Sequence, residues 1–518
     1  MLSDVLFVPV LVAYVLILVA LAAFGVNFFC LIAVALRTRR DGRVATPHSW
    51  PAVTVQLPVY NELYVARRLI DAVAAMEYPA GLLEIQVLDD STDETSHLVA
   101  EAVSRWRRQS VDIQHIHRPD RQGFKAGALR HGMSRARGEL LAILDADFLP
   151  QPDFLVALVP RLVADPGLAF VQACWGHVNR DSSLLTRLQA LAIDGHFAIE
   201  QTARCAGGLW FNFNGTAGIW RKAALESAGG WRDDTLTEDL DVSYRAFLAG
   251  WRAAYADDVV VPAELPVSYS AYRRQQHRWA RGSFECAAKH LPAVWRSSAP
   301  LGLKAEATLH LSGYGIHLLM LALTALYPLI LVVSQGRHQL LQLLGAMGVF
   351  NLTTVAPTLL FTVAQRRLHR PWLRQLPTIL LLSVFGSGLM VNTARAAWQA
   401  MRGTRGVFER TPKFAVRERK ERWQRKRYQI AADRIIAVEA VVMGLNLLTV
   451  AAAVRMQVWA IAVYAAVFAA GLGCSVLVTV VQDRRATLPR RRPRAQPAGL
   501  PAAGATIERH SSPFTADA

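Results

Sequence analysis

Long apolar runs alternate with polar stretches and place membrane-length segments toward both ends of the chain. A helix that crosses a bilayer needs about 20 largely apolar residues. Six runs approach or exceed that length, at residues 5–36, 311–334, 340–364, 375–400, 435–454 and 456–481. The first run lacks the basic start and cleavage site of a secretory signal peptide, so we expect an N-terminal transmembrane anchor over residues 1–45.

The net charge of +17 is concentrated beside these runs. Lys and Arg gather at 37–43, 366–374, 401–430 and 483–494, and the remainder of the chain is slightly acidic. This distribution follows the positive-inside rule and argues against a nucleic-acid-binding surface, so we expect no nucleic-acid partner.

The charge pattern makes the run 375–400 unusual. If all four basic stretches face the cytoplasm, this run begins and ends on the same side. It also contains several residues that suit a lipid-exposed span poorly: Gly386, Ser387, Gly388, Asn392 and Arg395. We therefore expect an interfacial or re-entrant helix here and about five spanning helices elsewhere. An ordinary span with a misassigned basic loop is the alternative.

The polar stretch over residues 46–300 alternates short apolar strands with helical segments. Strands are expected at 53–60, 84–91, 112–118, 140–147 and 168–175, and helices at 62–76, 94–108 and 127–136. This order predicts a largely parallel, doubly wound α/β sheet, in which ligands bind at the carboxyl ends of the strands. Neither GxGxxG nor GxxxxGK[ST] follows the first strand, which argues against hydride transfer and P-loop hydrolysis. The five scattered cysteines indicate no metal or disulfide framework.

Three strands end in polar residues that could reach a ligand: Tyr60 and Glu62, Asp89 and Asp90, and Asp145 and Asp147. The DxD pair Asp145 and Asp147 supplies hard oxygen ligands, which suit Mg²⁺ or Mn²⁺ beside substrate phosphates. Such a pair taken alone also fits helix capping. Further motifs follow in order at Phe213–Thr216, Thr237–Glu238–Asp239 and Gln275–Gln276–His277–Arg278–Trp279.

A first Asp, a DxD, a TED and a QxxRW in this order resemble the processive branch of glycosyltransferase family 2. That branch includes cellulose synthases, cellulose-synthase-like mannan synthases and hyaluronan synthases. The resemblance covers roughly residues 50 to 480. It implies a GT-A-like cytosolic domain inserted between transmembrane helices, and inverting transfer of a hexose from a nucleotide sugar, UDP-glucose or GDP-mannose, to a growing β-glycan.

The resemblance also implies roles for two motifs. Asp239 matches the general base that takes the proton of the acceptor hydroxyl, and Glu238 beside it would orient the acceptor or the loop. Asp145 and Asp147 match the motif that binds the divalent metal and the donor diphosphate, with Mg²⁺ or Mn²⁺ as the cofactor.

Other residues would bind the donor or the acceptor. The candidate donor-binding residues are Tyr60, Glu62, Asp89, Asp90, Lys125, Asp145, Asp147 and Arg278. One sequence leaves open which of Asp89 and Asp90 contacts the nucleoside. Arg278 offers a planar fork of donors for a diphosphate, while Gln275 and Trp279 would bind the acceptor, Trp279 by stacking on a sugar ring. A surface lysine at Lys125 and an interfacial anchor at Trp279 are the ordinary structural alternatives.

The basic stretch 401–430 contains a further candidate. Phe408–Glu409–Arg410–Thr411–Pro412–Lys413 keeps the Phe, Thr and Lys of the Phe-x-Val-Thr-x-Lys loop of cellulose synthases, and with Phe414 it looks like the RTPKF form of mannan-synthase-like relatives. It suggests a gating loop in which Thr411 and Lys413 approach the diphosphate. A basic stretch on the membrane surface is the competing interpretation.

The expected organisation is an anchor at 1–45, a glycosyltransferase domain at 46–300, a transmembrane and interfacial region at 301–481 and a disordered basic tail at 482–518. Polar residues within or beside the apolar runs suggest a path for the product: Asn351, Asn392, Arg395, Glu439 and Asn446. We expect synthesis and export of a β-1,4-mannan, glucomannan or glucan, with membrane lipid and accessory export proteins as further candidate partners. The alternatives are a single-addition enzyme making a glycolipid such as glucosylceramide, and a nucleotide-binding membrane receptor or transporter. Richness in Ala and Arg suggests a bacterial inner membrane with the catalytic domain in the cytosol.

Overall fold

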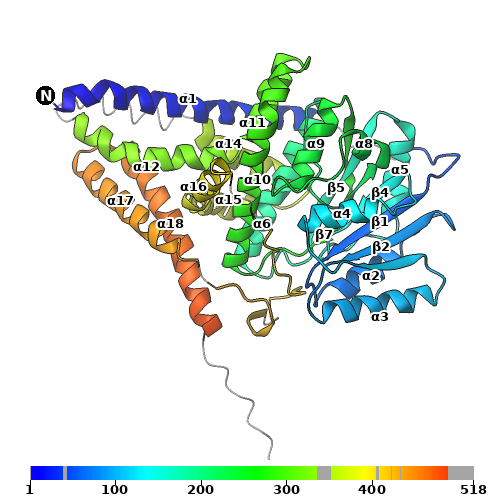
Figure 1. Ribbon diagram of the computed structural model, residues 1–518. Coiled ribbons are helices and arrows are strands. Elements are labelled where there is room, and N and C mark those ends of the chain that lie inside the picture. Colours follow the sequence, from blue (N-terminus) through cyan, green and yellow to red (C-terminus); the bar gives the residue numbers. More distant parts are fainter. Residues whose placement is uncertain are drawn as a thin grey trace, which may run out of the picture.

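The computed structural model describes residues 2–38, 44–334, 352–403, 406, 408–419, 421, 423–431 and 433–487. Figure 1 shows a sheet with flanking helices at one end of the molecule and a group of long helices at the other. Helix α1 (Leu2–Arg37) runs along one side and packs on α12 (Gly315–Val333) and α14 (Leu352–Arg367).

The sheet has seven strands in the order β3-β2-β1-β4-β6-β5-β7. Their bounds are β1 Val53–Val59, β2 Leu83–Asp89, β3 Ile113–His117, β4 Leu140–Ile143, β5 Leu168–His177, β6 Gly218–Arg221 and β7 Arg252–Ala263. All neighbours pair in parallel except β6, which runs antiparallel to both β4 and β5. The prediction of a largely parallel α/β sheet is confirmed, and the structure adds that the sheet is mixed, because the short strand β6 is inserted in the opposite direction.

Helices cover both faces of this sheet because its central strands are apolar on both sides. Leu140 and Ala142 of β4 contact one core, with α2 (Ala66–Ala74), α3 (Thr95–Arg107) and α5 (Phe154–Ala164). Leu141 and Ile143 contact the other core, with α4 (Phe124–Met133), α8 (Lys222–Ser227) and α9 (Glu238–Leu248). Successive side chains of a strand point to opposite faces, so one run of apolar residues serves two cores.

The remaining helices connect the sheet to the membrane part. They are α6 (Leu184–Gly195), the π-helical segment η1 (His196–Gln201), α7 (Thr202–Ala206), α10 (Tyr269–Arg296) and α11 (Leu301–Leu311). Helix α10 packs against α9 of the sheet domain and against α11, α16 (Met390–Met401) and α18 (Trp459–Thr487). It therefore bridges the two parts of the molecule.

Four helices among the described residues are long and apolar enough to cross a membrane: Leu6–Arg37 of α1, α12, α17 (Ile436–Arg455) and Trp459–Gln482 of α18. A fifth span is present if α15 (Trp372–Ser387) and α16 are counted together. The chain is thus an integral membrane protein by the length and composition of these helices. Of the expected run 340–364, the structure describes only the part within α14, so that span stays a prediction.

Helices α15 and α16 correspond to the run 375–400 and are bent by 44° at the break between them. Gly388 at this break lies against α18, where a Cβ on Gly388 would come within 2.5 Å of the Gly471 carbonyl oxygen. Asn392 donates to the main-chain oxygen of Arg273 on α10 at 3.1 Å. The bend is thus packed against protein, and it suits a broken span as well as the re-entrant helix that the charge pattern predicts.

Other polar residues of the apolar runs have partners within the protein. Glu439 on α17 accepts from Arg273 at 3.2 Å and from Ser475 on α18 at 2.8 Å. Arg395 pairs with Asp433 at 2.6 Å, and Asn446 donates to a carbonyl of its own helix, that of Val442, at 2.8 Å. Polar residues of membrane helices commonly bond to protein groups in this way. Asn351 lies outside the described residues.

Candidate active site

One cavity opens at the carboxyl ends of β1, β2 and β4, between the sheet and α10. It is lined by all but one of the residues that the sequence singled out: Tyr60, Glu62, Asp90, Lys125, Asp145, Asp147, Glu238, Asp239, Gln275, Arg278, Trp279, Thr411 and Lys413. These residues come from strand ends, two helix starts, the bridging helix and a distant loop. The fold therefore gathers motifs that are up to about 350 residues apart in the sequence.

The DxD carboxylates lie directly after β4. The backbone N–H of Asp145 donates to Thr216 Oγ1 at 2.8 Å, which ties the motif to the segment before β6. Because β6 is antiparallel, its amino end reaches this edge of the sheet. Lys125 Nζ, from the first turn of α4, lies 2.7 Å from Asp145 Oδ1 and 3.8 Å from Glu238 Oε1. Burial alone would lower the pKa of Lys125, but the charges of these carboxylates outweigh it and raise that pKa.

Asp239 lies in the first turn of α9. Burial, reinforced by the adjacent Glu238 carboxylate, raises the pKa of Asp239 to about 7, although Lys125 acts in the opposite direction. A general base works best when its pKa lies near the working pH. Gly215, with φ of +79°, approaches so closely that a Cβ there would lie 3.0 Å from Asp239 Oδ2. The backbone conformation and this contact both require glycine.

Three side chains of the QxxRW motif share one face of α10, because positions i, i+3 and i+4 align on a helix. They are Gln275, Arg278 and Trp279, and all three line the cavity. Arg278 Nη1 donates to the carbonyl oxygen of Glu409 at 2.6 Å, and its guanidinium lies 4.3 Å from the centre of the Phe408 ring. Burial lowers the pKa of Arg278, although the carboxylates nearby act in the opposite direction. The planar guanidinium could donate hydrogen bonds to an anionic ligand such as a diphosphate.

The segment 408–416 crosses the cavity and is held there by specific bonds. Lys413 Nζ donates to Asp147 Oδ2 at 2.6 Å and to the Glu264 carbonyl at 2.9 Å. The Glu264 carboxylate accepts from the backbone N–H of Phe414 at 2.8 Å and from Arg68 at 3.0 Å. The RTPKF run therefore lies inside the site in this structure.

Asp89 is the predicted donor-binding residue that the structure places outside the cavity. Asp90 lines the cavity and pairs with Arg118, whose Nε donates to Asp90 Oδ1 at 2.7 Å. The Asp89 carboxylate instead lies beside His115 on the outer strand β3. Consecutive residues at a strand end point to opposite faces, so only one member of the pair can face the ligand edge. The geometry favours Asp90 for nucleoside contact.

Three charged lining residues were not anticipated. The Arg121 guanidinium lies 3.5 Å from the centre of the Tyr60 ring, Arg410 contacts Glu62 at 3.4 Å, and Glu264 anchors the loop. Burial raises the pKa of Glu62 to about 8, against the opposing charge of Arg410. Arg121 lies just before α4, which carries Lys125, so nearness in the sequence is the signal that could have pointed to it. Arg410 and Glu264 owe their positions to long-range contacts.

Comparison with known proteins agrees with this geometry. Residues 51–282 match the family model described as "Glycosyltransferase like family 2". A probable glucomannan 4-beta-mannosyltransferase 7 of Oryza sativa subsp. japonica is 48% identical over 237 residues, which cover 45% of this chain and 40% of that protein. Glucomannan 4-beta-mannosyltransferase 2 of Arabidopsis thaliana is 45% identical over 238 residues, 45% of each chain.

The chain thus matches less than half of the length of these curated relatives. Among solved structures, a mannosyltransferase from Pyrobaculum calidifontis in complex with GDP-Man and Mn²⁺ has 24% identity and a TM-score of 0.47, covering 75% of this chain and 99% of that one. The DxD, TED and QxxRW motifs and the strands of the mixed sheet all lie within the residues that match the family model. Residues 51–282 of this protein thus match glycosyltransferase family 2, and its α/β domain is similar to the cellulose-synthase-like glucomannan mannosyltransferases.

Proposed function

We propose that the protein is a membrane-embedded inverting glycosyltransferase that polymerises β-1,4-mannan or glucomannan, with GDP-mannose as a donor. One observation carries the proposal: Asp239, the DxD carboxylates and the QxxRW side chains line a single cavity. Similarity to glucomannan 4-beta-mannosyltransferases over the same domain supports mannose as the sugar. Because less than half of those relatives is matched, donor and product need separate tests.

The side chains divide the reaction between them. The Asp239 carboxylate accepts the proton of the acceptor hydroxyl, whose oxygen attacks the anomeric carbon as the bond to the diphosphate breaks on the opposite side. This displacement inverts an α-linked donor to a β-glycoside. Arg278 and Lys125 stabilise the charge that develops on the leaving diphosphate. Trp279 supplies an aromatic face for the acceptor sugar, and Gln275 a hydrogen-bonding group.

The donor set fits a divalent cation. Asp145 and Asp147 each contact an ammonium group in this structure, Lys125 at 2.7 Å and Lys413 at 2.6 Å, so both carboxylates already face positive charge. Paired carboxylates beside phosphate are typical ligands of Mg²⁺ and Mn²⁺. Such an ion, when bound, would neutralise diphosphate charge. Lys413 would then have to leave Asp147, which links metal binding to movement of the loop.

The loop itself is proposed as a gate. Lys413 and Thr411 line the cavity, and the carbonyl oxygen of Glu409 accepts from Arg278, the residue assigned to the diphosphate. A donor would replace these contacts. Lys413→Ala should lower turnover and weaken donor binding, whereas Arg417→Ala, at an exposed position of the same basic stretch, should do neither. Unchanged turnover and donor affinity in Lys413→Ala would instead favour a basic membrane-surface stretch.

The decisive experiment supplies the protein in bilayers with radiolabelled GDP-mannose, UDP-glucose or UDP-N-acetylglucosamine in separate reactions. We expect mannose in alcohol-insoluble polymer that β-1,4-mannanase digests, and none from Asp239→Asn. Asp181→Asn is the matched control, because that side chain is 76% exposed. Label recovered only in lipid-soluble material would replace polymer synthesis with glycolipid synthesis. Incorporation from none of the donors would overturn the proposal.

Export and orientation need a separate assay. The basic stretches beside the apolar runs support synthesis on the cytosolic side, and the contacts of α10 with α16 and α18 support transfer of the product across the bilayer. In inside-out vesicles, polymer made from external GDP-mannose should resist external mannanase until detergent is added. Polymer digested without detergent would exclude export. The relatives named above are plant proteins, so a bacterial inner membrane as the location rests on the composition alone.

A further inference from the structure

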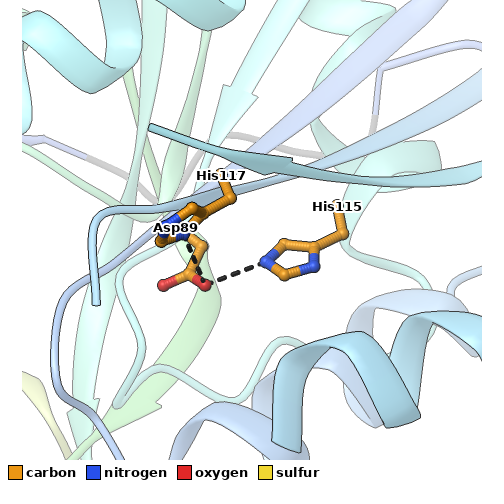
Figure 2. Close-up of side chains that lie close together, drawn as sticks. All are labelled: Asp89, His115 and His117. Atoms are coloured by element: carbon orange, nitrogen blue, oxygen red, sulfur yellow. Dashed lines mark hydrogen bonds and ion pairs between the residues drawn. The ribbon is translucent and has the colours of Figure 1, made fainter. Parts of the chain in front are cut away.

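A second cluster of chemically active side chains lies outside the cavity, at the edge of the sheet. Asp89 ends β2, and His115 and His117 lie on the edge strand β3 (Figure 2). Asp89 and His117 are register partners of the two parallel strands. His115 lies two residues earlier on β3 and shares the face of His117. Figure 2 shows both imidazole rings turned toward the same carboxylate.

The three ligand atoms lie close enough together to share one ion. Asp89 Oδ2 lies 2.8 Å from His115 Nε2 and 3.4 Å from His117 Nδ1, and the three ligand atoms all lie within 4.8 Å of one another. Ligands about 2.0–2.1 Å from a tetrahedral zinc ion are about 3.3 Å apart. The two measured separations lie on either side of that value.

The carboxylate is also oriented for this role. The backbone N–H of Ser91 donates to Asp89 Oδ1 at 2.8 Å, which leaves Oδ2 facing the two histidines. Such outer contacts commonly fix metal-binding side chains. Asp89 is buried, His115 half-buried and His117 45% exposed on its side chain, so the cluster is closed on one side and open on the other. A hydrogen bond to Asp89 explains His115, but it does not explain why a second, more exposed imidazole converges on the same oxygen.

We propose that Asp89, His115 and His117 form a binding site for a divalent cation of the zinc class, separate from the DxD carboxylates. Two imidazoles and one carboxylate favour Zn²⁺ over Mg²⁺, which prefers oxygen ligands, and exposure at His117 leaves the fourth position to water. The ligands are sequence neighbours of the Asp90–Arg118 pair, which lies at the cavity. A bound ion would join β2 to β3 beside that pair and stiffen the part of the cavity assigned to the nucleoside. The site stands on this geometry alone, whether or not the proposed reaction is correct.

Zinc binding to the full-length protein, without a histidine tag and in detergent, tests the proposal. Excess Mg²⁺ is present throughout to occupy oxygen-rich sites, and competition with a chromophoric chelator reports affinity. We expect one tight Zn²⁺ site, a rise in the melting temperature on binding, and at least about tenfold weaker binding in His115→Ala and in His117→Ala. His117→Cys should restore binding, because a thiolate also binds zinc. Co²⁺ should give the visible spectrum of a tetrahedral site.

Controls separate this site from others. His48→Ala, at an exposed position before the amino end of β1, should bind zinc as the unmodified protein does. Asp145→Asn should also retain binding if the site is separate from the DxD motif. Absence of tight binding by the unmodified protein would overturn the proposal. So would unchanged binding by His117→Ala, or loss of binding in Asp145→Asn.

Discussion

Glu264 offers the sharpest test of the loop that crosses the cavity. The residue is 3% exposed. Its carboxylate accepts from the backbone N–H groups of Phe414 at 2.8 Å and Val416 at 3.3 Å and from Arg68 at 3.0 Å. Glu264→Gln keeps the shape but removes the charge. It also places an NH₂ donor either against Arg68, which donates to Oε2, or against the two backbone N–H groups, which share Oε1.

The magnitude follows from those bonds. A hydrogen bond to a charged group contributes about 1.5–3 kcal/mol, and the substitution weakens several of them, so we expect closure of the loop to lose about 2–3 kcal/mol. That loss multiplies the open population by roughly 30 to 150, since about 1.4 kcal/mol corresponds to tenfold. We expect the effect on the segment 408–416, because the backbone N–H groups of this segment donate to the same carboxylate as Arg68.

Limited trypsin digestion followed by mass spectrometry measures the opening. Cleavage after Lys413 requires its ammonium to leave Asp147, so its rate tracks the open population when opening and closing are fast. We expect faster cleavage after Lys413 in Glu264→Gln by roughly the factor above, and no change in Glu418→Gln, whose side chain is exposed. Equal cleavage in the two variants would refute the assignment of Glu264 as the anchor of the loop.

Three further outcomes follow from the site. Because the base acts in its ionised form and burial raises the pKa of Asp239 to about 7, kcat/KM should rise with pH from about one-tenth of its plateau at pH 6 to about nine-tenths at pH 8. Asp239→Asn should lower the plateau by about 10²–10⁴-fold and lose this rise with pH, and a flat profile of the unmodified protein contradicts the assignment. Treatment with EDTA should abolish transfer, and Mg²⁺ or Mn²⁺ should restore it except in Asp145→Asn. Gly215→Ala should reduce turnover, because its Cβ would approach Asp239, whereas Gly250→Ala, with φ of +91° and nothing within 4 Å, carries similar backbone strain and should leave transfer unchanged.

The sequence predicted those features that depend on local pattern. Runs of seven or eight largely apolar residues predicted β1 to β5, because such strands are covered on both faces. Strand β6 is only four residues long, Gly218–Arg221, and its antiparallel position depends on pairing with β4 and β5 rather than on its own composition. The mixed direction of the sheet could not be predicted without those partners.

The site shows the same division. The motif residues were found because their spacing carries the chemistry, as with Gln275, Arg278 and Trp279 on one helical face. Asp89 and Asp90 could not be distinguished, since neighbouring residues at a strand end take opposite faces and the sequence does not say which face meets the cavity. Arg410 and Glu264 remained unnoticed because each meets its partner across more than 140 residues of chain.

The acceptor side of the site depends on the membrane helices as much as on the sheet. Arg273 lies two residues before Gln275 on α10 and is 2% exposed, and its buried ion pair with Glu439 of α17 helps to fix this turn of the helix. Breaking one partner of a buried pair is costly, because the other charge is left uncompensated. Ser475 of α18 also donates to Glu439, so three helices share the contact. The face that carries Gln275, Arg278 and Trp279 is thus oriented from within the membrane part. A fragment limited to the sheet domain would keep the base and the DxD carboxylates but lose the contacts that position the acceptor platform.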